Sequence, residues 1–316
     1  MIEMIRVGSM FAGIGGICLG FKSAGADIVW ANEIDHYACA TYRHNFGSCY
    51  LVECDISQFN LSSIPEIDIL TAGFPCQSFS VMGKQRGFAD PRGSLYFEIL
   101  KVIDVKSPRI VFLENVKNLL RHDRGRTFLT IYNTLAERGY GVKYAVIGAH
   151  THANIPQYRD RIFIAAFRDI DKLDTFAFPS EIPLITQIND LIDRNVRFPK
   201  NYYYTEQSSY FSLLNQRTKD INAIYRIDDS GVAVRAWNIA PTLKANMWTY
   251  HDRVPLIRDT FGIRRLSPEE CLALQGFPKC FEFPNILTKE IYKQIGNTVC
   301  VPVIVRIAQE ILKTLK

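Results

Sequence analysis

A cysteine in the stretch TAGFPCQSFS, residues 71–80, stands where a thiol could act as a nucleophile. Cys76 follows Gly-Phe-Pro at the end of the run IDILTAGF, which is typical of a short buried strand, and Pro75 fixes φ and ends the ladder. The residues beyond carry the glycine, serine, proline and charge of a loop. The carboxyl ends of strands in an open α/β sheet border the ligand crevice, so Cys76 is predicted to act there. A buried packing cysteine is the alternative, because free cysteine is commonly buried.

A carboxylate is predicted within another buried strand. The segment RIVFLENV, residues 109–116, has the β-branched and apolar density of a strand, and Glu114 stands near its end. Burying a carboxylate is costly unless the group is paired, hydrogen-bonded or functional. Glu114 is therefore a candidate catalytic residue, and a helix-capping turn is the alternative.

Two arginines have the spacing of one face of a strand. In QYRDRIF, residues 157–163, Arg159 and Arg161 are two positions apart, and side chains with that spacing share a face. Two guanidinium groups on one face require anionic or carbonyl oxygen partners. Asp160 points the other way and does not obviously neutralise them. The motif therefore predicts a site for an oxygen-bearing ligand.

A glycine-rich turn marks a second candidate site. The stretch FAGIGG, residues 11–16, follows a predicted strand and opens a predicted helix, so its backbone N–H groups can approach a ligand. Glu33 ends the next strand, 20 residues after Gly13, where an acidic residue can hold ribose hydroxyls. This geometry fits NAD and S-adenosylmethionine, and the GxGG spacing favours the sulfonium cofactor. Asp55 could accept a hydrogen bond from adenine, or could simply cap a helix or loop.

Alternating strands and helices would position these residues. We predict strands in IRVGSMF, ADIVWANE, IDILTAGF and RIVFLENV, and helices in GICLGFKSAG, DHYACATYRHNF and SLYFEILKVIDVK, which indicates a parallel, doubly wound sheet. YGVKYAVIGAH and DRIFIAAF follow as strands, and we expect them to close the sheet as an antiparallel pair. The pattern then becomes irregular from about residue 169 to 283, and VPVIVRIAQEILKTLK is an amphipathic helix.

The composition is that of a globular protein with a basic, aromatic region. The chain has 316 residues and a net charge of +5, and residues 190–265 hold 12 Lys and Arg against 8 Asp and Glu, an excess of 4. Basic residues mixed with aromatic ones suit nucleic acid, although a solvated face over an aromatic core fits equally well. Eight cysteines without a CxxC pair predict neither a zinc site nor a disulfide framework. No signal peptide or membrane span is recognised, so we expect a cytoplasmic protein.

Ten blocks in order carry a resemblance to one family. They are FAGIGG, NE, DI, GFPCQSFS, DPRGSLYFE, ENV, QYRDRIFI, TLKA, RRLSPEECLALQGFP and QIGNTV. With them nearly the whole chain resembles the DNA (cytosine-5-)-methyltransferases of bacterial restriction–modification systems. Ser78 and Met82 stand where this family varies. The resemblance implies an α/β fold, with a doubly wound mixed sheet of the Rossmann-like S-adenosylmethionine-dependent methyltransferase type. It implies a catalytic and cofactor-binding domain at 1–177 plus 286–316, and a second, smaller, irregular target-recognition domain at 178–285.

The resemblance implies covalent catalysis without a metal. Cys76 would add to carbon 6 of a flipped cytosine, while Glu114 would meet ring nitrogen 3 and the exocyclic amine. Arg161 would hold the carbonyl oxygen of the base, and Arg159 would support the site or the thiol. Further residues of the same blocks would support the site, namely Pro75, Gln77, Ser80 and Asn115.

The resemblance also implies the contacts to cofactor and DNA. Residues expected to bind S-adenosylmethionine are Phe11, Ala12, Gly13, Ile14, Gly15, Gly16, Glu33, Ile34, Asp55, Ile56, Gly73, Pro75, Leu95, Asn297 and Val299. Residues 80–93 are a candidate lid over the DNA. Residues expected to contact DNA are Ser80, Lys84, Arg86, Arg92, Arg235, Thr242, Lys244 and Arg253. The block RRLSPEECLALQGFP is expected to organise the recognition region.

Several functions are weighed against this one. A tRNA cytosine-5 methyltransferase shares the fold and most blocks, and the methyl acceptor distinguishes it. An NAD oxidoreductase would explain the glycine turn and Glu33, but it leaves Cys76 and Glu114 without a role. A catalytically inactive DNA-binding relative is disfavoured because Cys76, Glu114 and Arg161 are all present. We expect a monomer that acts on double-stranded DNA in the bacterial cytoplasm at the nucleoid, with a cognate restriction endonuclease as functional partner.

Overall fold

The computed structural model describes residues 4–47, 50–74, 95–228, 231–235, 239–248 and 253–315, with side chains at 228 and 231–235 left out. Two compact units make up the chain. The first consists of Met1–Ile147, Asp160–Ser180 and Val303–Lys316, and the second of Gly148–Arg159 and Glu181–Pro302. The second unit thus differs from the 178–285 expected for a recognition domain, because its main segment begins at Glu181 and it also takes in residues 148–159 and 286–302.

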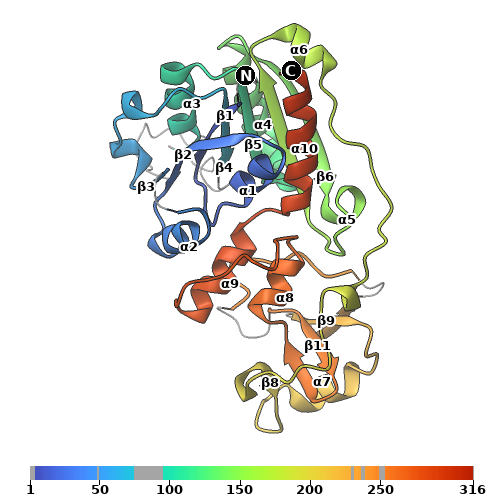
Figure 1. Cartoon of the computed structure of the whole chain (residues 1–316). Coiled ribbons are helices and arrows are strands. Elements are labelled where there is room, and N and C mark those ends of the chain that lie inside the picture. Colours follow the sequence, from blue (N-terminus) through green and yellow to red (C-terminus); the bar gives the residue numbers. More distant parts are fainter. Residues whose placement is uncertain are drawn as a thin grey trace. The chain divides into compact units, whose positions relative to one another are not determined.

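The first unit is built on a seven-stranded mixed sheet (Figure 1), with the strand order β3-β2-β1-β4-β5-β7-β6. Its first five strands pair in parallel, as the alternation of strands and helices predicted. The β7 strand runs antiparallel to β5, and β6 lies beside β7 at the edge. The bounds are β1 Arg6–Met10, β2 Asp27–Glu33, β3 Leu51–Glu53, β4 Ile69–Gly73, β5 Ile110–Val116, β6 Gly141–Gly148 and β7 Asp160–Phe167.

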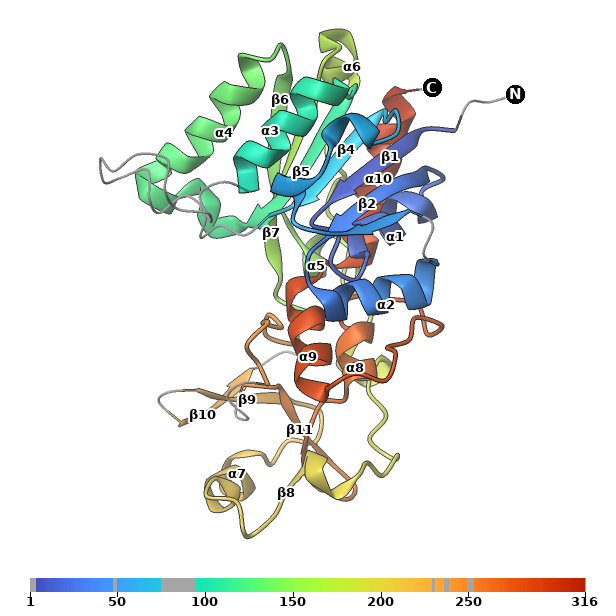
Figure 2. The same cartoon turned by 90° about the vertical axis from the view of Figure 1, so that its left-hand side faces the viewer.

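Helices cover both faces of this sheet, which is why its central strands are continuous apolar runs. On one face α3 and α4 lie over the sheet (Figure 2). Their buried apolar side chains share one hydrophobic cluster with Val111 and Leu113 of β5. On the other face the Phe21 ring of α1 meets the Phe112 ring edge-on, 5.4 Å between centroids. The helices of this unit are α1 Gly16–Ser23, α2 His36–Phe46, α3 Leu95–Lys106, α4 Arg126–Ala136, α6 Ile170–Thr175 and most of α10 Val301–Thr314.

The last helix packs tightly against the first. A Cβ built on Gly20 of α1 would lie 2.4 Å from Ile304 of α10, so only glycine permits this approach. The stretch Thr288–Thr314 has the length and apolar composition of a membrane-crossing segment, but it is mostly buried inside the protein, which is typical of core helices. Burial against the protein therefore accounts for its apolar residues.

The α4 helix was not predicted from the sequence, although Phe128, Ile131 and Leu135 have helical spacing and are buried. Its approach is unusual, since Asp123, Arg124 and Gly125 all adopt left-handed conformations, with φ of 51°, 57° and 85°. Two of the three are not glycine, so this turn holds backbone strain.

The second unit contains more regular structure than the sequence indicated. It holds a five-stranded sheet with the order β10-β9-β11-β12-β8, whose pairs are antiparallel. A small core of Tyr204, Leu214, Tyr225, Leu256 and Ile263 lies beneath it. The elements are α5 Ala149–His152, β8 Tyr203–Tyr204, α7 Phe211–Arg217, β9 Ile224–Asp228, β10 Gly231–Arg235, β11 Leu256–Asp259, β12 Gly262–Arg265, α8 Pro268–Ala273 and α9 Thr288–Asn297.

Candidate active site

The predicted thiol lies beyond the described end of β4. The predicted residues outside the described ones are Pro75, Cys76, Gln77, Ser80, Lys84, Arg86 and Arg92. The chain is described up to Phe74, whose carbonyl accepts a 2.8 Å hydrogen bond from the Asn115 amide. The Asn115 side chain is buried, and its oxygen accepts from the Val116 N–H at 2.8 Å. Asn115 therefore fixes the backbone two residues before Cys76 to the end of β5.

A part-buried ion pair lies at the same edge of the sheet. The Arg161 Nε is 3.1 Å from the Glu114 Oε1, and the two side chains are 15% and 12% exposed. Strand direction explains the meeting, because β7 is antiparallel to β5 and brings its first residues to the end of β5, where Arg161 pairs with Val116. Mutual attraction offsets the cost of taking both charges out of water. Glu114 therefore has an ionic partner inside the sheet, and the capping-turn alternative is wrong.

A glycine lies beside this pair. A Cβ on Gly73 would lie 3.3 Å from the Glu114 Oε2, so a larger residue at the end of β4 would crowd the carboxylate. Asp160 faces Lys117, with 3.1 Å between Oδ2 and Nζ. A carboxylate beside a guanidinium can recognise a planar group, because the carboxylate accepts hydrogen bonds from its N–H groups and the guanidinium donates to its carbonyl oxygen.

Arg159 does not share a strand face with Arg161, and this prediction was wrong. The strand starts at Asp160, so Arg159 precedes it. The residue is 2% exposed, and its guanidinium donates to the carbonyls of Leu243 at 3.0 Å and Gly296 at 3.1 Å, and also to that of Thr298. Spacing alone could not reveal this, because alternation holds only inside the strand.

The glycine turn is held together by the predicted acidic residue. Glu33 accepts from the Gly13 N–H at 2.8 Å through Oε2, and from the Ile34 and Asp35 N–H groups at 2.8 and 2.9 Å through Oε1. A carboxylate offers about four acceptor positions, so one remains for a further donor beside these three. The Ile34 side chain is 64% exposed, and its apolar surface could lie against a flat ring.

Left-handed conformations shape the same turn. Phe11, Gly13 and Gly15 have φ of 54°, 56° and 86°. A Cβ on Gly15 would lie 2.4 Å from the Phe46 ring. Glycine is therefore required at this position both by the left-handed φ and by the lack of space for a side chain. The turn ends at Gly16, where α1 begins, and Ile14 is buried beneath it. Backbone N–H groups and a helix start therefore meet where a ligand was predicted.

Asp55 caps a short turn. Its Oδ1 accepts from the Ser57 N–H at 2.9 Å and the Ser57 hydroxyl at 2.8 Å, ahead of a 3₁₀ turn at Ile56–Gln58. Asn32, which the sequence pattern does not mark by itself, is buried and donates to the carbonyls of Val52 at 3.2 Å and Cys54 at 3.0 Å. A buried amide at the end of an apolar strand was the signal that could have identified it.

The remaining predicted contacts divide between the units. Leu95 begins α3 in the first unit. In the second, Asn297 ends α9 and Val299 is buried just beyond it. The Thr242 hydroxyl donates a hydrogen bond to the carbonyl of Tyr158, and Lys244 is exposed. Arg253 is half-buried, and the Arg235 side chain lies outside the described ones.

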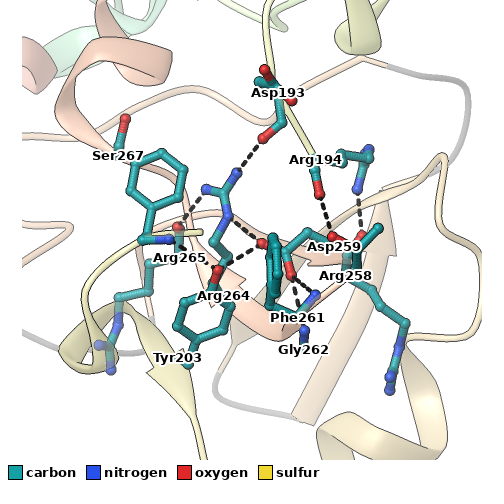
Figure 3. Close-up of polar contacts among 12 residues, drawn as sticks. Asp193, Arg194, Tyr203, Arg258, Asp259, Phe261, Gly262, Arg264, Arg265 and Ser267 are labelled. Carbon is teal, nitrogen blue, oxygen red and sulfur yellow. Dashed lines mark hydrogen bonds and ion pairs between the residues drawn. The ribbon is translucent and has the colours of Figure 1, made fainter. Parts of the chain in front are cut away.

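A buried ion cluster organises the block that was expected to be structural (Figure 3). Arg264 is fully buried, with its Nε 2.7 Å from Asp259 and its two terminal nitrogens each 2.7 Å from Glu270. Burial opposes the charged form, but the bonds to Glu270 and Asp259 outweigh it and raise the pKa of Arg264. Glu270 also forms a capping box with Ser267 at the start of α8.

A metal centre finds no support in the described part of the chain, where no three His, Cys, Asp or Glu side chains gather to hold an ion.

Comparisons with known proteins match the chain along its length. The family model described as C-5 cytosine-specific DNA methylase matches residues 5–313. Type II methyltransferase M.Bsp6I of Bacillus sp. is 44% identical over 99% of this chain and 100% of its own length. Type II methyltransferase M.HhaI of Haemophilus parahaemolyticus is 36% identical over 97% of this chain and 94% of its own. The solved structure of a Spodoptera frugiperda DNMT2 mutant covers 98% of this chain and 99% of its own, with a TM-score of 0.74 at 20% identity, which shows a common fold.

Proposed function

Since this chain belongs to the C-5 cytosine-specific DNA methylase family and is a DNA cytosine-5 methyltransferase, we propose that it methylates cytosine within one short sequence of duplex DNA. The proposal rests chiefly on the part-buried pair of Glu114 and Arg161 at the sheet edge where β4 leads toward Cys76. S-adenosylmethionine supplies the methyl group in this proposal.

Cys76 is the proposed nucleophile. Its thiolate forms a bond to carbon 6 of the cytosine ring, and this addition makes carbon 5 nucleophilic. After carbon 5 is methylated, loss of its proton and departure of the thiolate restore the ring and free the enzyme. The base must leave the stacked duplex for this chemistry, so flipping is part of the proposal.

Glu114 and Arg161 would recognise the flipped base together. The Glu114 carboxyl faces ring nitrogen 3 and the exocyclic amine, and a proton at nitrogen 3 offsets the negative charge that thiolate addition builds up. Arg161 binds the carbonyl oxygen of the base. The 3.1 Å pair holds both groups in place before the base arrives, which limits reorganisation during the reaction.

The first-unit residues fit S-adenosylmethionine. Glu33 keeps one acceptor position for a ribose hydroxyl, and exposed Ile34 offers apolar surface to adenine. Asp55 binds through Oδ1 to Ser57 and would receive the adenine amine on Oδ2. The other proposed contacts are Phe11, Ala12, Gly13, Ile14, Gly15, Gly16, Ile56, Gly73, Pro75, Leu95, Asn297 and Val299.

Sequence recognition is assigned to the region 178–285, which carries Arg235, Thr242, Lys244 and Arg253. Phosphate and base contacts from such residues would position and specify the DNA. Residues 80–93 would close over the target. A monomer working in the cytoplasm beside a cognate restriction endonuclease completes the proposal.

The direct test is base-resolution mapping of 5-methylcytosine in plasmid DNA incubated with the protein and S-adenosylmethionine. We expect methylation at one short motif, abolished in Cys76→Ala and retained in Cys280→Ala, whose thiol is exposed. Absence of methylation on any DNA would contradict the proposal, and tRNA would be the next acceptor to test.

Glu114→Gln tests the recognition of the base. It keeps the size of the side chain but removes the acid, so single-turnover methylation should slow by about 10²–10⁴-fold, the range for a general acid. DNA binding in a gel-shift assay should persist. Glu66→Gln, at an exposed carboxylate, is the matched control.

A further inference from the structure

The Arg159 side chain binds two distant parts of the second unit at once. Its Nη1 donates to the carbonyl of Leu243, while Nη2 donates to the carbonyls of Gly296 and Thr298. The latter two lie at the end of α9, where the helix dipole favours a cation. A single guanidinium thus joins the segment 242–245 to the end of α9.

Backbone packing shows that these two segments are in direct contact. A Cβ on Gly296 would lie 2.1 Å from the Lys244 carbonyl carbon and 2.2 Å from the Ala245 nitrogen. No side chain fits there, so Gly296 allows the two backbones to touch. The joint is therefore specific, and it depends on both the glycine and the guanidinium.

Buried amides reinforce the joint. The Gln157 side chain accepts from the Leu243 N–H at 3.2 Å and donates to the Leu274 carbonyl at 2.7 Å. Gln275 donates to the Ile295 carbonyl at 3.0 Å, one residue before Gly296. The Tyr158 N–H donates to the Ala240 carbonyl at 2.8 Å. Residues 157–159 are thus hydrogen-bonded both to the segment around Leu243 and to the region at the end of α9.

This arrangement leaves Arg159 engaged with the protein itself. Three carbonyls already receive its N–H groups, and the residue is only 2% exposed. A guanidinium held in this way acts through the segments it binds. The segments in question carry Thr242 and Lys244, proposed to contact DNA, and Asn297 and Val299, proposed to contact the cofactor.

We propose that Arg159 is a positioning residue that locks the segment 242–245 to the end of α9, so that the DNA-contacting and cofactor-contacting segments hold one geometry. This inference deepens the proposed function and rests on it for the roles of the two segments. Arg161, which pairs with Glu114, contacts the cytosine in this proposal, while Arg159 affects the binding of DNA and cofactor through the two segments.

Native-state hydrogen exchange tests the lock without any activity. Arg159→Lys keeps the charge but loses the planar fork of donors. We expect the amides of 240–247 and 294–300 to lose protection together, by about tenfold or more, since a lost charge-assisted hydrogen bond corresponds to roughly that factor. Unchanged exchange in either segment overturns the lock.

Two further variants keep this test sharp. Gly296→Ala forces the backbones apart with Arg159 intact, and it should release the same two segments. Lys143→Gln is the matched control, since Lys143 Nζ also binds carbonyls at a helix end, those of Leu173 at 2.7 Å and Phe176 at 2.8 Å, in the first unit. It should leave both segments protected.

Kinetics then separate positioning from catalysis. In Arg159→Lys we expect the KM for S-adenosylmethionine and the Kd for DNA to rise about tenfold, with kcat at saturation nearly kept. Arg161→Lys should lose kcat instead. A fall in kcat at unchanged KM for Arg159→Lys overturns the inference. If the wild type methylates no DNA, the proposed function fails, and hydrogen exchange still decides whether Arg159 forms the lock.

Discussion

Two buried arginines in the second unit are stabilised in different ways. Arg264 lies between the carboxylates of Asp259 and Glu270, and its guanidinium also stacks on the Phe198 ring at 4.1 Å. Arg159 donates to backbone carbonyls at the end of α9 and in the segment 242–245. A buried cation can therefore be held by opposite charges or by peptide dipoles. The difference determines what remains when the arginine is removed, because one site would keep two buried charges and the other only dipoles.

The largest effect is expected for Arg264→Leu. It leaves Asp259 and Glu270 as buried carboxylates without their cation, and breaking a buried ion pair in this way costs roughly 3–5 kcal/mol. Urea denaturation should show this loss in the free energy of unfolding. Arg217→Leu, at an exposed arginine on α7, is the control and should change it little.

Removing one of the two unpaired carboxylates should restore part of the free energy of unfolding that Arg264→Leu loses. Adding Glu270→Gln to Arg264→Leu leaves one uncompensated carboxylate in place of two, so the double variant should be more stable than Arg264→Leu alone. If the double variant is the less stable of the two, packing rather than charge accounts for the site.

Arg159→Leu should cost less, about 1–3 kcal/mol, because it leaves carbonyl groups without donors but no unpaired charge. The same urea experiment measures it. A loss as large as that of Arg264→Leu would remove the distinction between the two sites.

The smallest effect is the pH dependence of the free energy of unfolding that arises from Cys271, the neighbour of Glu270 in the Arg264 cluster. Burial, and the charge of adjacent Glu270, raise the pKa of the Cys271 thiol well above its usual value. The native state therefore keeps a proton on this thiol at a pH where the unfolded state loses it. The contribution of the thiol to the free energy of unfolding is fully present below about pH 8.5. Above that pH the free energy of unfolding falls by up to about 1.4 kcal/mol per pH unit. Urea denaturation from pH 7.5 to 10 should show this slope. Cys271→Ala should reduce it, whereas Cys280→Ala should not.

The sequence predicted the sheet of the first unit well, because its strands and helices alternate with clear periodicity. The β4 and β5 strands and helices α2 and α3 lie where the apolar patterns placed them. Glu114 could be recognised because a carboxylate in an apolar strand is conspicuous. Its pairing with Arg161 could not be predicted, since it depends on the register of β7 against β5.

The error at Arg159 has a similar cause. Two-residue spacing predicts one face only where both residues are in the strand, and β7 begins at Asp160. The partners of Arg159 lie more than eighty residues away in the chain, at Leu243 and Gly296. Local pattern carries no information on such contacts. The same holds for Asn115, whose amide fixes the Phe74 carbonyl across two strands.

The close approach of Gly20 to Ile304 has a consequence for biosynthesis. Residues 303–314 of α10 leave the ribosome after residues 181–302, so the side of α1 that α10 covers stays exposed until the second unit has been made. Contacts between such distant segments also form slowly. Limited proteolysis of a chain that stops before Val301 should cut within the first unit, where α1 lacks its contact with α10. The order of translation then ensures that the unit proposed to transfer the methyl group is finished only after the unit proposed to select its DNA sequence.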